Sequence, residues 1–434
     1  MFGLDLEKHV DVKVFMPLLG KWFWKELHEV SRAVPSTHIS RAPNVPFRMG
    51  PYLLMGCPLW GDEYIARFTT LCLPTLMSAR NKAALSGRCR IVLFTNEASF
   101  SGLWNLARDM TNSGIETLVY VVPSNVMDKI NDMPLNKYWL LGACQQLSIQ
   151  MAGRWGMAFH ALHPDHIHAE AYFENVFRLA EKHPGAGIAQ TGISADIHAA
   201  LSDLEKFRQP DSSLAIPDRD LGSIGWKHLH KQIRGLTMNG VDILGNDMPN
   251  SHFLMWTGKD KLYAFCCHMN AVYLPPEATA RSPIHLFNAM DTMLPYYMPK
   301  DVYVPDADDG LTFIEVSDEK KSANDVRVSF PDWAAQCWNT VHGSDAWMPF
   351  FETVCEIPVH EQAEYMEEEA IRSQHATLVE GLKASKEPIM EALTAMHKAM
   401  EEKKAAAAKP KSARAMKRQM RRSNGAVPAH MGAD

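Results

Sequence analysis

The chain has 434 residues, of which 46% are hydrophobic and 22% are charged, so it can bury a large core and has room for two structural units. The formal net charge of −6 argues against a protein whose whole surface is built to bind nucleic acid. The charge is uneven, because residues 401–422 hold nine Lys or Arg and two Glu; this segment is +7 and the remainder of the chain is −13.

The eight cysteines are scattered, without a Cys-x-x-Cys pair or the dense spacing of a secreted disulfide scaffold. Reduced thiols are therefore expected. Near the N-terminus, Asp5 and Glu7 precede any apolar stretch, and the longest apolar run there is broken by Pro17. That run is far shorter than a spanning helix or a secretory signal, so we expect a soluble, cytoplasmic protein.

Residues 13–34 carry large apolar side chains at helical spacing and predict a helix that packs on the main domain. From Tyr52 onward, continuous apolar runs alternate with segments of helical periodicity. The predicted strands are YLLMGCPLW (52–60), CRIVLFTNEAS (89–99), ETLVYVVP (116–123), GMAFHALHPD (156–165) and AGIAQTG (186–192). The predicted helices cover 62–81, 101–114, 126–133, 135–153 and 168–185. This alternation is typical of an α/β fold with a mostly parallel sheet flanked by helices.

The second half of the chain is less regular and predicts a mixed α+β region. Residues 251–275 indicate a hairpin that turns at Gly258-Lys259-Asp260. The other predicted elements are helices at 198–207, 224–236 and 332–356, a polar loop at 208–223, and strands around an acidic turn within 302–321.

The C-terminal region has a different composition. Residues 361–404 are rich in Glu, Ala, Lys and Met and predict an exposed helix or short coiled coil, whereas 405–434 are a basic, low-complexity tail that we expect to be disordered. The basic stretch RAMKRQMRR (414–422) has three interpretations: a solvated tail, an anchor for an anionic membrane surface or protein partner, or a non-specific nucleic-acid contact. It has no aromatic residue for base stacking, so an anchoring role is favoured over nucleic acid.

Polar residues follow four of the predicted strands. They form the segments Cys57–Asp62, Thr95–Glu97, Pro123–Asn125 and His163–His166. The carboxyl ends of parallel strands meet at one edge of a sheet, and helices that begin there favour anionic groups such as a diphosphate. No GxGxxG follows the first strand and no GxxxxGK[ST] occurs, which weakens dehydrogenase and kinase interpretations.

Several stretches together resemble a group of bacterial glycosyltransferases of the GT-A type. They are GCPLWGDEYIARFTTLCLPTLMSARN, RCRIVLFTNEASF, HPDHIHAEAYFENVFRLAEKHPGAGIAQTG, FCCHMNAVYLPP and SPIHLFNAMDTMLPYYMPKDVYVPDADDGLTFIEVSDE. The resemblance covers about residues 50–350. It implies a nucleotide-sugar-binding half at 50–200 and an acceptor-side half at 201–358, with extensions at 1–49, 359–404 and 405–434.

In GT-A enzymes an Asp-x-Asp motif ends a central strand and holds a divalent cation on the diphosphate of the donor. The resemblance places His163-Pro164-Asp165 at this motif, with Asp165 as the last aspartate and His163 in place of the first. A hard cation such as Mg²⁺ or Mn²⁺ would neutralise the leaving diphosphate. A further histidine ligand is expected from the second half, where His268 is preferred over His252.

The resemblance also implies a general base and donor contacts. Asp291 is the choice for an acidic base that takes the acceptor's proton in an inverting transfer. The alternative acidic cluster, Asp306, Asp308 and Asp309, is favoured as a solvated turn. For the nucleotide, the resemblance places Pro58, Leu59 and Trp60 in contact with the base or ribose. Glu97 would accept hydrogen bonds from the ribose hydroxyls. The alternative is that Trp60 is a core residue and that Glu97 caps a helix.

The histidine-rich stretch FHALHPDHIHAEAYF (159–173) also admits other interpretations. A tetrahedral zinc site built from its four histidines is disfavoured, because the spacing does not fit HExxH and because His160 and His163 would point to opposite faces of an extended segment. Alternatively, Asp165 caps a helix beginning near His166 or Ile167. Adjacent Cys266 and Cys267 are interpreted as small core residues rather than catalytic thiols.

Together these features predict a glycosyltransferase that uses a nucleotide-sugar donor, with a glycan, lipid or protein as acceptor. The competing hypothesis is a catalytically silent GT-A-like scaffold that acts through its C-terminal helix and basic tail, and the histidine at the first motif position favours it. A peripheral location at the inner face of a membrane is compatible with either.

Overall fold

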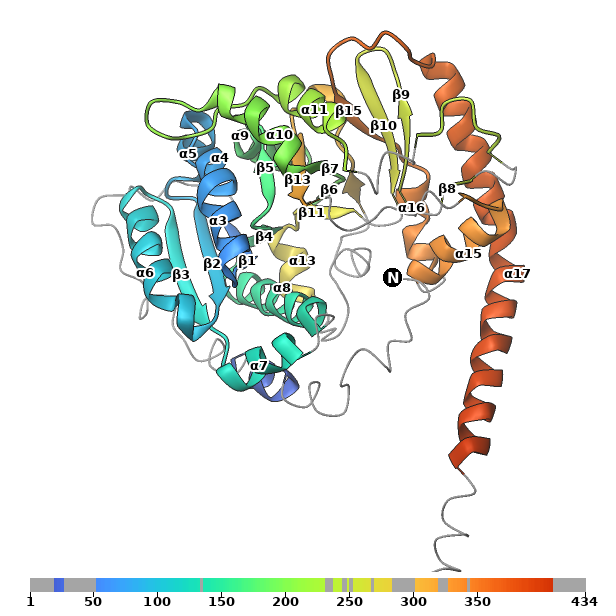
Figure 1. Cartoon of the computed structure of the whole chain (residues 1–434), viewed down its shortest axis with the longest axis horizontal. Coiled ribbons are helices and arrows are strands. Elements are labelled where there is room, and N and C mark those ends of the chain that lie inside the picture. Colours follow the sequence, from blue (N-terminus) through green and yellow to red (C-terminus); the bar gives the residue numbers. More distant parts are fainter. Residues whose placement is uncertain are drawn as a thin grey trace, which may run out of the picture. The chain divides into compact units, whose positions relative to one another are not determined.

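The computed structural model describes residues 19–26, 52–132, 136–230, 237–243, 248–249, 253–266, 269–282, 301–318, 327–341 and 344–408 (Figure 1). Residues 19–26 form a helix, within the range predicted for the N-terminal helix. Its Leu19, Trp22 and Phe23 are buried, as expected for a helix that packs through an apolar face.

A four-stranded parallel sheet forms the centre of the first half, in the order β3-β2-β1-β4. The strands are β1 (Leu53–Pro58), β2 (Cys89–Thr95), β3 (Glu116–Val121) and β4 (Ala158–Ala161). All six residues of β1 are buried, which is the pattern of a strand covered on both faces. The predicted α/β class with a parallel sheet is confirmed.

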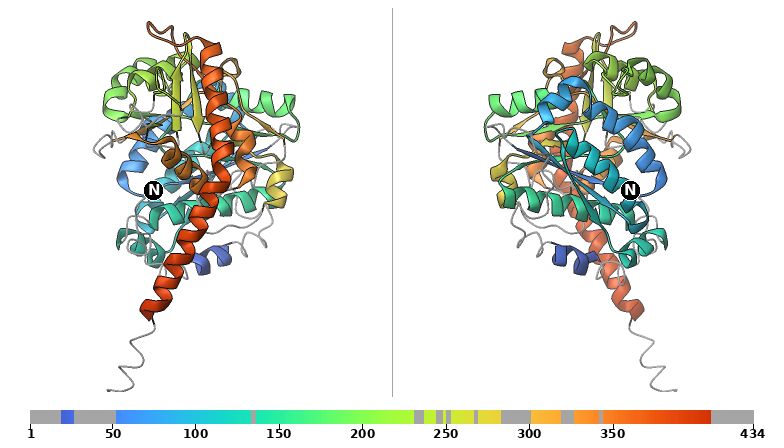
Figure 2. Two further views of the ribbon diagram at one scale, coloured as in Figure 1. Left: turned by 90° about the vertical axis from the view of Figure 1, so that its right-hand side faces the viewer. Right: turned by 90° about the vertical axis from the view of Figure 1, so that its left-hand side faces the viewer.

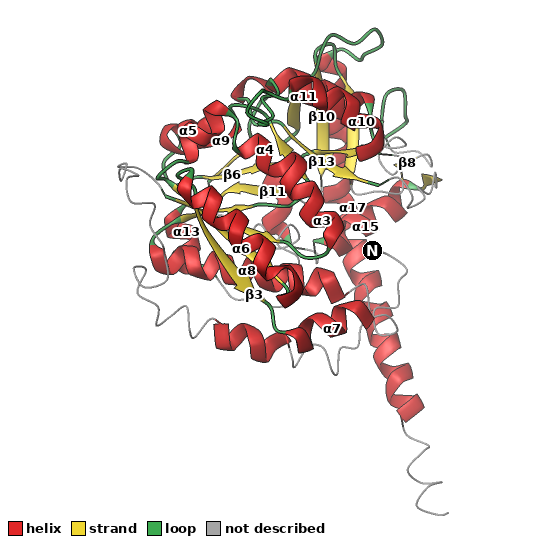
Figure 3. Cartoon of the chain, turned by 60° about the vertical axis from the view of Figure 1, so that its left-hand side comes forward, coloured by secondary structure: helices red, strands yellow, loops and turns green. Residues whose placement is uncertain are grey.

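Helices cover both faces of this sheet (Figure 3). Alternate β1 residues, Leu53, Met55 and Cys57, enter the core cluster that also includes Phe68 and Leu103 from the helical segments on that face. The intervening residue of β1, Gly56, faces α8 so closely that an added Cβ would lie 2.2 Å from Ser148 Oγ. The helices of this half are α3 (Asp62–Arg67), α4 (Leu73–Leu76), α5 (Ala79–Leu85), α6 (Glu97–Asn112), α7 (Ser124–Asp132) and α8 (Asn136–Trp155).

The helix predicted across residues 62–81 is interrupted. After α3 the chain forms a π-helical segment, η1 (Phe68–Cys72), in which the Leu73 amide donates to the Phe68 carbonyl five residues earlier. Pro74 follows at the start of α4 and has no amide hydrogen for a regular α-helical bond. The proline therefore sits where the hydrogen-bond ladder is already irregular.

The sheet continues beyond β4 through strands that lie far apart in sequence. Phe159 and Leu274 exchange two backbone hydrogen bonds of 2.9 Å, which join β4 to the end of β11 (Asn270–Tyr273). Next come β6 (Gly187–Gln190), antiparallel to β11, and β12 (Val302–Tyr303), parallel to β6. The prediction of β6 as a strand is confirmed, but an antiparallel strand separates it from β4.

A second small sheet contains β5 (His166–His168), β13 (Phe313–Ser317) and β7 (Ile193–Asp196). β13 runs antiparallel to β5 and parallel to β7. The helix predicted from residue 168 is wrong at its start, because Ile167 and its flanking histidines pair with Phe313–Glu315 as a strand. The helix, α9 (Tyr172–Lys182), begins only at Tyr172.

The predicted hairpin of the second half is confirmed as β9 (Phe253–Thr257) and β10 (Lys261–Cys266). A hydrogen bond from the Gly258 amide to the Lys261 carbonyl closes its turn. β15 (Cys355–Pro358) pairs with the other edge of β10. The helices here are α10 (Ile197–Leu204), η2 (Glu205–Phe207), α11 (Asp218–Lys227), α13 (Pro276–Arg281), η3 (Ala307–Asp309), α15 (Phe330–Thr340), η4 (Asp345–Trp347) and α16 (Met348–Phe351). Two short strands, β8 (Met248–Pro249) and β14 (Arg327–Val328), pair with each other.

The chain divides into two compact units, 1–381 and 382–434, and the long helix α17 (Glu368–Ala408) contributes to both (Figures 1 and 2). Within the first unit, the α17 residue Gln374 accepts a 2.8 Å hydrogen bond from Trp256 Nε1. The helix predicted within 361–404 is confirmed from Glu368 onward. The basic stretch at 414–422 lies outside the described residues, so its anchoring role stays a prediction, as do the domain boundaries.

No helix in the described part of the chain combines the length and the apolar character needed to cross a membrane.

Two helical glycines give a matched prediction about packing. A Cβ on Gly222 of α11 would lie 2.0 Å from the backbone oxygen of Pro358 in β15, whereas a Cβ on exposed Gly102 of α6 would meet nothing within 4 Å. Gly222→Ala should therefore lower the free energy of unfolding by about 3 kcal/mol, because α11 must shift off the sheet. Gly102→Ala should raise it by about 1 kcal/mol through helix propensity. Urea denaturation of both variants checks this; equal effects would contradict the packing of α11.

Candidate functional site

The turn that joins β4 to β5 is the centre of the candidate site. It follows the carboxyl end of β4 and holds His163, Pro164 and Asp165. Two backbone hydrogen bonds fix it: the His166 amide donates to the His163 carbonyl at 3.2 Å, and the Val316 amide of β13 donates to the Asp165 carbonyl at 2.9 Å. The second of these bonds anchors the turn to the sheet that contains β13.

Asp165 does not cap a helix. The residues that follow it form β5, and α9 begins six residues after His166, with Ala171 at its N-cap position. The helix-cap interpretation of Asp165 is therefore wrong, because residues 166–168 pair with β13 instead of starting a helix. The Asp165 side chain is left available for another role.

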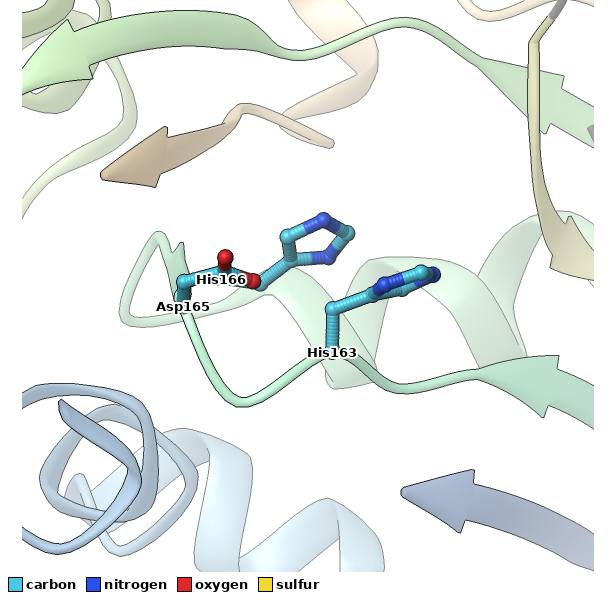
Figure 4. Close-up of side chains that lie close together, drawn as sticks. All are labelled: His163, Asp165 and His166. Carbon is cyan, nitrogen blue, oxygen red and sulfur yellow. The ribbon is translucent and has the colours of Figure 1, made fainter. Parts of the chain in front are cut away.

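Three side chains from this turn gather beside it, as Figure 4 shows. His163, Asp165 and His166 each offer a ligand atom, and these atoms lie within 4.8 Å of one another. The two imidazole rings are stacked, with centroids 4.6 Å apart and an interplanar angle of 27°. In the part of the chain that the structure describes, this is the one group of three such side chains close enough to share a metal ion.

The environment of Asp165 combines desolvation with positive charge. Burial raises the pKa of its carboxyl group, while His163, Arg67 and Lys137 act in the opposite direction. The Arg67 guanidinium is buried, donates a 3.3 Å hydrogen bond to the Val316 carbonyl and pairs with Glu63. Because Arg67 and Lys137 both act on Asp165, the site has cationic groups suited to an anionic ligand.

The nearby thiols are not nucleophiles. Burial raises the pKa of Cys57 and of Cys72 well above that of a free cysteine, and the charge of Asp165 adds to both shifts. Both groups are therefore protonated at neutral pH. Cys266 is also buried, in β10, which agrees with its interpretation as a core residue; Cys267 lies outside the described residues.

The four histidines of this stretch separate into two pairs. His160 and His168 are buried in an aromatic core, where the His168 ring lies 4.7 Å from Tyr172 and 5.2 Å from Phe173 between centroids. The His160 Nδ1 atom donates to the Val272 carbonyl at 2.8 Å, and burial lowers the pKa of His160 to about 4. The described side chains thus form no four-histidine zinc cluster, and only His163 and His166 join Asp165.

The ends of β1 and β2 lie beside the end of β4, at the same edge of the sheet. Pro58 ends β1 and is buried; Leu59 is fully buried and its amide donates to the Phe94 carbonyl at 2.7 Å. Trp60 is only half-buried. Of these three residues, Trp60 therefore has the side chain accessible to a ligand.

Glu97 is exposed at the first position of α6 and is not its cap. The cap is Asn96, whose side chain accepts a 2.9 Å hydrogen bond from the Ser99 amide. The helix-cap interpretation of Glu97 is therefore wrong by one residue. Its carboxylate projects from the helix that starts after β2, at the same edge as Trp60.

The predicted site residues from the second half cannot be compared with this geometry. His268, its alternative His252, and Asp291 all lie outside the described residues. The acidic cluster is described: Asp306 caps η3 by accepting from the Asp308 amide. Asp309 is buried, accepts a 2.5 Å hydrogen bond from the Tyr303 hydroxyl and pairs with Arg178. This cluster is a structural turn, although Asp309 is enclosed rather than solvated.

Sequence reasoning missed Arg67, Lys137, Gln145 and His166 as members of this site. Gln145 of α8 places its amide nitrogen 3.4 Å from His163 Nε2. Arg67 had a usable signal, because it lies in the helix directly after β1. Gln145 and Lys137 had none, since α8 reaches the site only through the folding of the chain.

Comparisons with known proteins add the following findings. No protein-family model and no curated protein sequence matches the chain. Among solved structures, S. aureus TarS (residues 1–349, in complex with UDP) matches at 9% identity and a TM-score of 0.33, over 69% of this chain and 71% of that one. Mouse xyloside xylosyltransferase 1 matches at 15% identity and a TM-score of 0.22, over 37% of this chain and 58% of that one. Core-mannan synthase A from Aspergillus fumigatus, in an Mn/GDP form, matches at 13% identity and a TM-score of 0.21, over 40% of this chain and 54% of that one.

All of these TM-scores lie below 0.5, so the fold described above rests on the strand pairings of this chain itself.

Proposed function

We propose that this protein is a glycosyltransferase that binds the diphosphate of a nucleotide sugar at the carboxyl edge of the central sheet. The observation that carries the proposal is the convergence of His163, Asp165 and His166 on the turn after β4. Parallel sheets bind ligands at this edge, and here the candidate cation site lies at the same edge as the ends of β1 and β2. The sequence resemblance to GT-A glycosyltransferases supports the same reaction class.

A divalent cation fits the donor atoms of this turn, because a carboxylate and two imidazoles lie within 4.8 Å of one another. Asp165 and His163 would hold the ion, and His268 remains our proposed ligand from the second half. When bound, the cation would supply positive charge that stabilises the leaving diphosphate. Arg67 and Lys137 would add to that charge, since both already act on the Asp165 carboxylate.

The remaining proposed contacts complete the donor and acceptor positions. Trp60 would stack on or flank the base or ribose, with Pro58 and Leu59 forming the floor beneath it, and Glu97 would accept hydrogen bonds from ribose hydroxyls. In the reaction, the bond between the anomeric carbon and the phosphate oxygen breaks, with its electron pair leaving on the diphosphate. The acceptor hydroxyl oxygen bonds to the anomeric carbon, and its proton passes to a base, for which Asp291 is proposed.

Calorimetric titration of the full chain with UDP-, GDP- and CMP-sugars, with and without Mn²⁺, tests the proposal. We expect one nucleotide class to bind, and Mn²⁺ to increase its affinity about tenfold or more, because the cation would offset the negative charge of the diphosphate. No binding of any nucleotide with or without Mn²⁺ would reject the transferase function. Nucleotide binding without transfer or hydrolysis would instead favour the silent GT-A-like scaffold.

A further inference from the structure

The His163–His166 turn supplies an unusual donor set for a cation on a diphosphate. Its three candidate ligands come from four consecutive residues, and two of the three are imidazoles. Mg²⁺ requires oxygen ligands in a nearly ideal octahedron and seldom takes imidazole nitrogen. Mn²⁺, Co²⁺ and Zn²⁺ accept mixed nitrogen and oxygen sets.

The two rings are held in place by their neighbours before any ion binds. The His166 ring contacts both the stacked His163 ring and the Phe313 ring of β13, whose centroid is 4.9 Å away. The backbone of His166 is paired with Glu315 in the β5–β13 ladder. The Gln145 amide nitrogen of α8 lies 3.4 Å from His163 Nε2 and helps to position that ring.

The third candidate ligand of the site is a carboxyl group. The carboxyl group of Asp165 lies beside both rings and adds oxygen donors to their nitrogen donors, which is the mixed set that these transition metals accept.

We propose that His163, Asp165 and His166 together form a transition-metal site that selects Mn²⁺, Co²⁺ or Zn²⁺ against Mg²⁺. This inference rests on the proposed function for its place in catalysis, and it adds His166 as a ligand and a preference among cations. It extends the sequence-based expectation, in which Asp165 and His268 held either Mg²⁺ or Mn²⁺.

The test is metal binding by the full-length protein, followed through the visible ligand-field absorption of Co²⁺ and by calorimetry with Mn²⁺, Zn²⁺ and Mg²⁺. Each titration is run with the metal alone and again with UDP present. We expect bound Co²⁺ to show a visible ligand-field band of the kind that imidazole ligands produce. We also expect the affinity for Mn²⁺, Co²⁺ or Zn²⁺ to exceed that for Mg²⁺ by about tenfold or more.

Variants assign the ligands. His163→Asn and His166→Gln should each weaken Co²⁺ binding by about tenfold or more and change the band, because each loses an imidazole donor. His198→Asn is the matched control, since His198 is exposed and lies on α10, and it should bind Co²⁺ as the wild type does. His163→Asn serves if His166→Gln fails to fold, because His163 is only half-buried.

Three results would overturn the inference: no Co²⁺ binding either alone or with UDP, equal affinity for Mg²⁺ and Co²⁺, or an unchanged Co²⁺ band in His163→Asn. The Co²⁺ absorption can be measured without the nucleotide-sugar donor and without the sugar acceptor. If the cation preference and its loss in the variants hold while no nucleotide binds, the metal site stands and only the transferase function fails.

Discussion

Asp165→Asn should reduce sugar transfer, or hydrolysis of the donor, by about 10³-fold, which corresponds to about 4 kcal/mol of activation free energy. The substitution keeps the size of the side chain but removes its negative charge, so the proposed cation loses its only carboxylate ligand within the described turn. Most of the loss should appear in kcat, because the charge on the diphosphate is greatest as the bond to the sugar breaks. Initial rates at saturating donor concentration measure it.

Asp308→Asn is the control for this variant. Asp308 belongs to the acidic turn that the sequence offered as an alternative base, and its side chain is exposed. Its rate should stay within about twofold of the wild type, as is usual for a surface substitution. A wild-type rate in Asp165→Asn, or an equal loss in both variants, would contradict the role of Asp165.

Acid should destabilise the protein well before its carboxylates titrate, because buried histidines are neutral in the fold. Burial lowers the pKa of His160 to about 4, and that of His375 in α17 to about 4 as well, from 6.5 in each case. Between these values the unfolded chain binds protons that the folded chain does not, so stability falls as the pH falls below 6.5. Each of these two histidines should lower the free energy of unfolding by about 2 kcal/mol when the pH falls from 7 to 5.

Other groups modify this profile. Burial also lowers the pKa of His166 and of His168, which steepens the loss in the same pH window. The raised pKa of Asp165 works in the opposite direction, because a carboxyl group that resists ionisation in the fold favours the folded state as the pH falls. The histidines outnumber it, so the net effect expected is destabilisation.

Urea denaturation at pH 7 and pH 5 measures this loss, and His375→Gln isolates one contribution. The glutamine can still donate to the Phe351 carbonyl that His375 Nε2 contacts at 2.9 Å, but it cannot take up a proton. The variant should therefore lose about 2 kcal/mol less than the wild type on the same change of pH. A pH dependence identical to that of the wild type would show that His375 is not held neutral.

The local patterns of the sequence were sufficient for the parallel sheet. Continuous apolar runs predicted β1, β2 and β3, and the intervening periodicity predicted their helices. Burial on both faces leaves this direct mark on the composition of β1 and β2, whereas β3, at the end of the sheet, is only partly buried. The same reasoning predicted the edge at which Trp60, Glu97 and Asp165 now lie. In a parallel sheet that edge follows from strand direction alone.

Features that depend on distant segments could not be predicted. The local sequence after Asp165 predicts the start of a helix. Residues 166–168 form a strand only because they pair with β13, about 150 residues later. The insertion of β11 between β4 and β6 has the same origin. Likewise, the sequence shows His166 only as one of four histidines within nine residues. Its pairing with His163 depends on the turn geometry, and the separation of His160 and His168 depends on the core around Tyr172.

The central claim is that a cation and a nucleotide diphosphate meet at Asp165. Anomalous diffraction at the manganese edge, from crystals grown with Mn²⁺ and UDP, tests it most directly. We predict one strong anomalous peak in direct contact with an Asp165 carboxylate oxygen and with both phosphates of UDP. UDP bound with its diphosphate away from the β4–β5 turn, or a manganese peak elsewhere with none at Asp165, would contradict the account.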